Sequence, residues 1–157
     1  MKLFIAILFL AGNLSAANPL PPEQVNTLIG ALGRLDPALV NSNPALKERL
    51  GQVLDAVRGE ARSVALIKKF QVKGRELDLL AVAVKHPNDP AGVEAMGMVL
   101  AGDGKKSVDA LLTGKDAKQA AAVARALGNS NNQKVIPLLA PLVVDVAIHA
   151  NVRKEAV

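Results

Sequence analysis

Apolar residues recur at helical spacing along most of this chain. Between 44 and 58 they fall at positions i, i+4, i+7, i+8 and i+11. The same periodicity returns in three later segments, which are 76–85, 117–127 and 133–144. No run alternates apolar and polar residues on both sides of a tight turn, as the strands of a hairpin would. The pattern predicts an all-α protein.

Turn residues separate these segments. Asn43 precedes Pro44, and Asp89 precedes Pro90, so each pair combines a preferred N-cap with proline at the first helical position. A left-handed residue often ends a helix, and glycine adopts that conformation at least cost. We therefore expect left-handed helix ends at three glycines: Gly102, Gly114 and Gly128.

Two segments conflict with simple helical patterns. A helix over 21–35 would be weakened by two internal glycines. Pro137 fits the first turn of the 133–144 helix, whereas Pro141 is expected to kink or divide it. Asp145 and His149 interrupt the apolar residues that follow, which argues against a transmembrane helix there.

Helix length and loop length predict how the helices are arranged. From residue 91 onward, helices of about 10–13 residues alternate with short loops, which favours antiparallel neighbours. A pair of helices with one apolar stripe each leaves apolar surface uncovered, and stacking the next pair covers it. The alanine-rich segment 120–124 allows close helix contact. These features predict an α-solenoid of short antiparallel helix pairs.

Internal similarity supports repetition. Residues 98–103 align with 124–129 at an offset of 26, and 111–112 align with 138–139 at an offset of 27. A third copy begins at Asn151, where Ala156-Val157 matches Ala122-Val123, and this last repeat is incomplete.

These segments resemble HEAT repeats. Residues 124–129, a polar loop and then 135–139 are similar to the family's pattern of a helix, a small-Leu-Gly end, a loop and an apolar helix. Residues 151–157 look like the valine-arginine opening of another repeat. The resemblance implies an armadillo-type superhelix over 86–157, preceded by an N-terminal helical region at 18–85 that is either degenerate repeats or a cap.

A narrower resemblance covers 86–95, which read His-Pro-Asn-Asp-Pro-Ala-Gly-Val-Glu-Ala. This stretch is similar to exported bacterial proteins that carry HEAT repeats before a c-type haem module and are often labelled membrane-bound dehydrogenases. The haem-attachment motif Cys-x-x-Cys-His is absent, because the chain has no cysteine. The resemblance therefore implies no haem or other cofactor for these residues.

The first 17 residues have the pattern of a secretory signal peptide. Lys2 precedes the apolar run 3–11, and Ser15 and Ala17 place small side chains at the −3 and −1 positions of a cleavage site. A nine-residue run is too short to span a bilayer. A buried N-terminal helix and an uncleaved anchor are the alternatives. We expect an exported protein, periplasmic or extracellular, without a transmembrane helix in the mature chain.

Composition excludes several kinds of chemistry. The 157 residues contain no cysteine, which excludes disulfides, cysteine-ligated zinc, iron–sulfur clusters and a thiol nucleophile. The two histidines, His86 and His149, are interpreted as a loop residue and a helix-end residue. Glu76 and Asp78 lie two apart on a predicted helix, so their side chains diverge. We predict no catalytic residue, metal site or cofactor, and no enzyme activity.

Basic residues are concentrated in 47–85, which holds nine Lys or Arg against five Asp or Glu. Export argues against nucleic-acid binding, and Phe70, the only aromatic residue after 17, offers no stacking platform. The readings that remain are a solvated face and contact with anionic lipid or an envelope polymer. The residues expected to make such a contact are Arg62, Lys68, Lys69, Lys73 and Arg75.

Two functions follow as expectations. The first is an exported, non-catalytic scaffold that binds another protein through the surface of its stacked helices. The scarcity of aromatic residues removes the usual interface anchors, so such an interface would be modest or aliphatic. The second is an N-terminal accessory region of a larger exported c-type-haem or dehydrogenase protein, with the cofactor domain outside this chain.

Overall fold

The computed structural model describes residues 20–144 and 150–157. Every regular element in these ranges is a helix, and they contain no strand. This confirms the predicted all-α class. The predicted signal peptide at 1–17, together with Asp145 and His149, lies outside the described residues.

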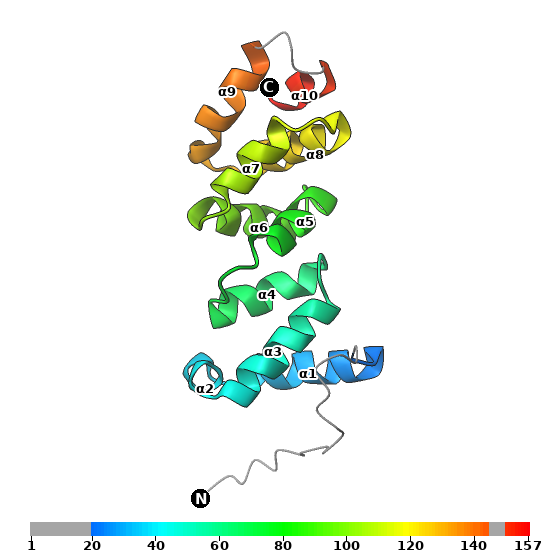
Figure 1. Ribbon diagram of the computed structural model, residues 1–157, viewed down its shortest axis with the longest axis vertical. Coiled ribbons are helices and arrows are strands. Elements are labelled where there is room, and N and C mark those ends of the chain that lie inside the picture. The colour runs from blue at the N-terminus through cyan, green and yellow to red at the C-terminus, as the bar shows by residue number, and fades with distance from the viewer. Residues whose placement is uncertain (1–19, 145–149) are drawn as a thin grey trace, which may run out of the picture.

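The helices succeed one another along the long axis of the molecule in chain order (Figure 1). Their bounds are α1 (Pro22–Arg34), α2 (Pro37–Ser42), α3 (Pro44–Ala56), α4 (Ala61–Phe70), α5 (Glu76–Lys85), α6 (Pro90–Ala101), α7 (Lys105–Leu112), α8 (Ala117–Gly128), the 3-10 turn η1 (Gln133–Val135), α9 (Ile136–Val144) and α10 (Ala150–Glu155).

The predicted helices at 44–58, 76–85 and 117–127 correspond to α3, α5 and α8 within two residues at each end. Asn43 caps α3 as predicted, because its side-chain oxygen accepts hydrogen bonds from the amides of Ala45 and Leu46 at 3.0 and 3.3 Å. Asp36 caps α2 by the same kind of bond. The sequence patterns had not identified α2 or α4.

The start of α6 differs from the prediction in one respect. Asp89 precedes Pro90 as expected, but its side chain makes no cap hydrogen bond. Its Oδ2 lies 3.1 Å from Nδ1 of His86 instead. Gly92 lies against the same residue, since a Cβ atom added there would be 1.8 Å from the His86 carbonyl oxygen. The close packing of α6 on the end of α5 therefore requires glycine at this position.

The three glycines expected to end helices in the left-handed conformation do not adopt it. Gly102 is extended, with φ −96°. Gly114 has no positive φ, and Gly128 is the last residue of α8. Among described residues, positive φ angles occur at Gly59, Gly74, Gln71 and Asn131.

The C-terminal helices differ from the prediction in two respects. Helix α7 has 8 residues, fewer than expected. The predicted 133–144 helix begins as the 3-10 turn η1, and α9 then runs through Pro141 without being divided. Pro137 and Pro141 are both exposed, so the hydrogen bond that Pro141 cannot donate is lost on the solvent side of the helix.

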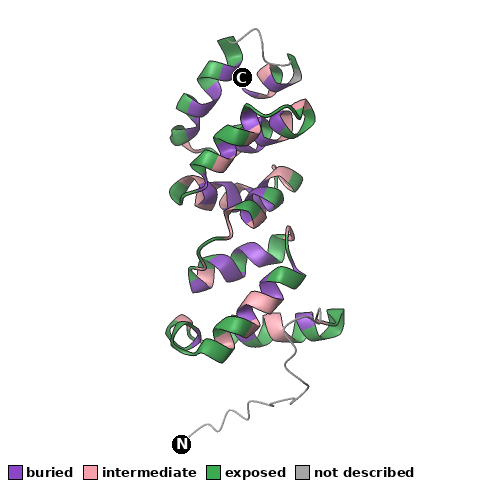
Figure 2. Cartoon of the chain, in the orientation of Figure 1, coloured by how far each residue is buried: buried purple, intermediate pink, exposed green. Residues whose placement is uncertain are grey.

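Buried residues lie where neighbouring helices meet (Figure 2). The pairs that pack together include α5 with α6, α4 with α6, and α8 with α7 and α10. Phe70 is among the largest fully buried side chains. One continuous apolar cluster extends from Leu32 on α1 to Ala156 after α10.

Burial tests the internal alignments. At the offset of 27, Leu112 and Leu139 are both buried. The offset of 26 fails, because it pairs the fully buried Val99 with the exposed Arg125.

Candidate functional site between α3 and α5

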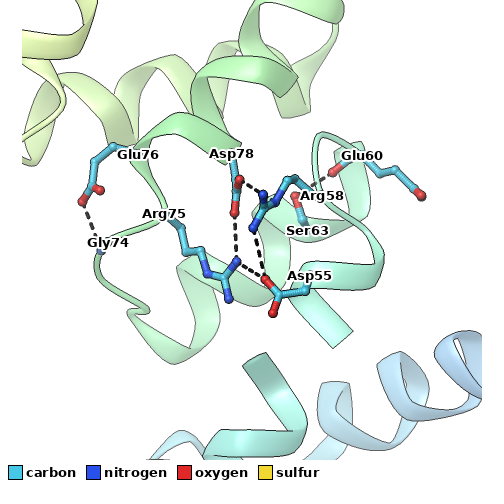
Figure 3. Close-up of polar contacts among 8 residues, drawn as sticks. All are labelled: Asp55, Arg58, Glu60, Ser63, Gly74, Arg75, Glu76 and Asp78. Atoms are coloured by element: carbon cyan, nitrogen blue, oxygen red, sulfur yellow. Dashed lines mark hydrogen bonds and ion pairs between the residues drawn. The ribbon is translucent and has the colours of Figure 1, made fainter. Parts of the chain in front are cut away.

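Four charged side chains meet where the end of α3 faces the start of α5 (Figure 3). Arg75 Nη1 donates to Asp55 Oδ1 at 2.5 Å and to Asp78 Oδ2 at 3.1 Å. Arg58 Nε lies 3.1 Å from Asp78 Oδ1, and its Nη2 lies 3.4 Å from Asp55 Oδ1. Each arginine thus contacts both carboxylates, and we call these four residues the charged network.

Local structure on both sides brings these side chains together. Asp55 lies in the last turn of α3, and Arg58 follows that helix. On the other side, Arg75 is the N-cap residue of α5 and Asp78 lies in its first turn. The spacing of three residues puts this second pair on one face. Gly74, with φ 75°, adopts the left-handed conformation that leads the chain into α5.

Two buried residues, Val57 and Ser63, anchor the turn between α3 and α4. Val57 is fully buried beside Arg58. Ser63 is also buried, and its hydroxyl donates to the carbonyl oxygen of Glu60 at 2.7 Å (Figure 3). Because the buried hydroxyl has a partner, the turn carries no unsatisfied polar group at this point. The buried Val57 and Ser63 anchor the turn from which Arg58 extends toward Asp55 and Asp78.

Electrostatic interactions in the network favour the charged forms of Asp55 and Arg75. The hydrogen bond from Arg75 lowers the pKa of Asp55, although partial desolvation acts in the opposite direction. Burial acts to lower the pKa of Arg75, but hydrogen bonds and charges from Asp55 and Asp78 outweigh it and raise that pKa. The positive and negative charges balance within the network. Asp55 and Arg75 therefore stay ionised at neutral pH, and the network forms an ionic link between α3 and α5.

A hollow of about 430 Å³ lies beside the network. Glu76 faces away from Asp78, and its carboxylate accepts a hydrogen bond from the Gly74 amide at 3.2 Å (Figure 3). The predicted divergence of Glu76 and Asp78 is therefore confirmed. The residues that line the hollow are Arg58, Gly74, Arg75, Glu76, Leu77, Asp78, Asp103 and Ser107.

The five basic residues predicted to contact an anionic surface are divided among several internal contacts. Arg75 belongs to the charged network. Arg62 contacts Glu60 and Asn26, and Lys68 pairs with Glu94.

Of the remaining two, Lys69 donates to the carbonyl oxygen of Gly33 and lies 5.5 Å from the centre of the Phe70 ring. Lys73 is exposed. Four of the five cations therefore already contact groups within the protein. Binding to an anionic surface is not tested by these contacts, and it stays a prediction.

Sequence reasoning had not identified Asp55, Arg58 or Asp78 as partners of Arg75. The spacing of three between Arg75 and Asp78 was a usable signal, since it places opposite charges on one helical face. Nothing in the sequence indicates that the end of α3 reaches this face, because that contact depends on the path of α4 between them.

His86 lies at the end of α5 and contacts Asp89. Residues 20–144 and 150–157 contain no group of three or more His, Cys, Asp or Glu side chains arranged to hold a metal ion. Within the same ranges, every helix is too short or too polar to cross a membrane.

Comparisons with protein-family models, with curated proteins and with solved structures found no match to this chain.

Proposed function

We propose that this protein is an exported, non-catalytic α-solenoid scaffold that binds another protein. The observation that carries the proposal is the order of packing: helices pack mainly against helices that lie close to them along the chain. Such near-neighbour packing is the defining property of repeat arrays, whose extended surfaces serve as binding sites. The pattern of residues that resembles HEAT repeats supports the same arrangement.

The packing of every second helix in the C-terminal half, α6, α8 and α10, also supports the proposal. Helix α8 packs against α6 and against α10, so these three form a row in which each covers part of the next. Hydrogen bonds connect the same region at its surface. Asn129 donates to the side chain of Asn88 at 2.7 Å, and Arg125 donates to Glu155 on α10.

Exposed apolar side chains support binding as the role of this scaffold. Leu77 on α5 is 67% exposed, and on α9 Ile136 and Val144 are 63% and 78% exposed. These are aliphatic residues, as expected for an interface in a protein that contains almost no aromatic side chains.

Hydrogen exchange tests the solenoid part of the proposal. Val53 is fully buried in α3, and replacing it by alanine should destabilise the helices around it. In a one-dimensional array, amide protection should fall in α1–α4 and change by less than about twofold in α8 and α10. The matched variant Val123→Ala, in α8, should show the reverse pattern. An equal loss of protection along the whole chain in both variants would contradict the array.

Export has its own test. The full chain expressed in a bacterial host should be recovered outside the cytoplasm with Asn18 as its first residue. Ala17→Arg should block this processing, because a large charged side chain does not fit the −1 position. An unprocessed protein retained in the cytoplasm would contradict export without affecting the scaffold.

A further inference from the structure

We propose that the groove along α5 is the docking site for a short amphipathic helix of the partner protein, one with an apolar stripe and a basic residue near one end. This inference rests on the proposed scaffold function and names the surface and the chemistry of its partner. Two adjoining hollows on either side of Leu77 carry the argument.

The first hollow is apolar and has a volume of about 380 Å³. It lies between α5, α7 and α8. Its floor contains Leu80 and Val123, which are buried, and Leu111 on α7 is half-buried at its side. Leu77, Ala81, Val84 and Lys85 lie at i, i+4, i+7 and i+8 on α5, so they form one face of that helix. The groove therefore offers a row of three aliphatic side chains, from Leu77 through Ala81 to Val84, along most of α5.

The second hollow places negative charge at the start of this row. Glu76 and Asp103 both line it. Gly104 packs against Glu76, since a Cβ atom added at Gly104 would be 3.4 Å from the Glu76 Cβ, and this brings the neighbouring Asp103 to the N-terminal end of α5. Arg58 and Arg75 also line the hollow, but their charges are balanced by the aspartates of the charged network.

Glu76 and Asp103 are not balanced in that way. Neither carboxylate is in an ion pair within residues 20–144 and 150–157. At the opposite end of the row, Lys85 lines the apolar hollow. The groove thus has an acidic end, an apolar centre and a basic end.

This order of charges specifies the occupant. Helices favour acidic residues in their first turn and basic residues in their last turn. A helix of that kind complements the groove when its basic end lies beside Glu76 and Asp103 and its acidic end lies beside Lys85. It would then run antiparallel to α5. The apolar stripe of the partner would cover Leu77, which at 67% exposure is among the most exposed large apolar residues described.

The test uses the full chain and two stapled synthetic helices labelled with a fluorophore. Both peptides carry leucines at i, i+3, i+4 and i+7. One has glutamates in its first turn and arginines in its last turn, and the other has these charges exchanged. Fluorescence anisotropy should show at least about fivefold tighter binding of the first peptide, and methyl NMR signals of Leu77 and Val84 should shift on its addition.

Variants assign the binding to the groove. Leu77→Asp should weaken binding by about tenfold or more, because it places a charge in the centre of the apolar row. Asp103→Lys should remove the preference between the two peptides. Leu39→Asp is the matched control, since Leu39 is 47% exposed on α2, away from the groove, and binding should stay within about twofold. Circular dichroism checks that each variant keeps its helix content.

Three results would overturn this inference. They are an absence of binding of either peptide at millimolar concentration, equal weakening by Leu39→Asp and Leu77→Asp, and self-association of the protein that Leu77→Asp abolishes. The last result would assign the groove to a second copy of this chain. None of these results changes the hydrogen-exchange test of the array, so failure of the groove and failure of the scaffold are distinguishable.

Discussion

Arg125 on α8 and Glu155 on α10 are joined by two hydrogen bonds, from Nε to Oε2 at 2.8 Å and from Nη2 to Oε1 at 2.7 Å. This bidentate geometry fixes the orientation of both side chains. The contact lowers the pKa of Glu155 and raises that of Arg125. It joins α10 to α8 at the surface, and these two helices also pack together, with Val152 of α10 buried.

Loss of this pair should loosen α10 locally. We expect Arg125→Gln to speed amide exchange in α10 severalfold while exchange in α1–α4 stays unchanged, because the pair connects only α8 and α10. The double exchange Arg125→Glu with Glu155→Arg should restore much of the protection. Lys118→Gln is the control, since Lys118 is an exposed lysine on α8 that lies outside this pair. Equal exchange in Arg125→Gln and in the unmodified protein would contradict this role.

Gly92 should be among the least replaceable residues of the chain. Gly92→Ala introduces a Cβ atom only 1.8 Å from the His86 carbonyl oxygen, so the backbone of α5 or α6 must move. We expect a loss of at least about 2 kcal/mol in the free energy of unfolding, measured by urea denaturation. Gly97→Ala, at a position in the same helix with open space, should be neutral or stabilising. Similar stability of the two variants would show that α6 does not pack on His86 in this way.

The charged network should contribute to stability in a pH-dependent way. Since the folded-state pKa of Asp55 is lowered, its contribution is fully present above the unfolded value near 3.8 and is lost as the pH falls through the lower folded value. Asp55→Asn should therefore be less stable than the unmodified protein at pH 7, by less than about 1 kcal/mol because the side chain is largely exposed.

Thermal unfolding of both proteins between pH 2 and pH 7 measures this effect. The difference between their midpoints should shrink below about pH 4 and vanish once Asp55 is protonated in the folded state. Asp103→Asn serves as the control, because Asp103 lies outside the charged network. A difference that is constant across this pH range would exclude the ionic link as its cause.

Contact with an anionic surface is tested with vesicles that contain about one third phosphatidylserine. Reversing Lys68 and Lys69 to glutamate should lower the affinity more than tenfold, because each cation near such a surface contributes about 1 kcal/mol. Binding should also weaken as salt is raised. Lys105→Glu with Lys106→Glu, on α7, is the matched control. Absent or salt-independent binding would refute the contact.

Local signals in the sequence predicted local structure well. The apolar periodicity located α5 at its observed bounds, and the Asn43-Pro44 pair located the start of α3. Helices α2 and α4 were missed for different reasons. Helix α2 has only six residues, too few to show a period. Helix α4 begins without a side-chain cap, and the left-handed residue that follows it is Gln71 rather than a glycine.

The candidate site was harder to predict than the helices. Its residues come from α3, from the following turn and from the start of α5, and only packing brings them together. The sequence also could not show which basic residues are buried and paired within the protein. Arg75 has a side chain only 18% exposed between two aspartates, whereas a count of charges treats it like the freely exposed Lys73.

The order in which these helices pack has a consequence for how the chain acquires its structure. Helices α5 and α6, which pack together, are separated only by residues 86–89, so little loop-closure entropy opposes their contact. Helical proteins that are rich in such local contacts fold quickly, on the scale of microseconds to milliseconds. Each helix can dock as soon as its immediate successors have formed, without waiting for a distant part of the polypeptide.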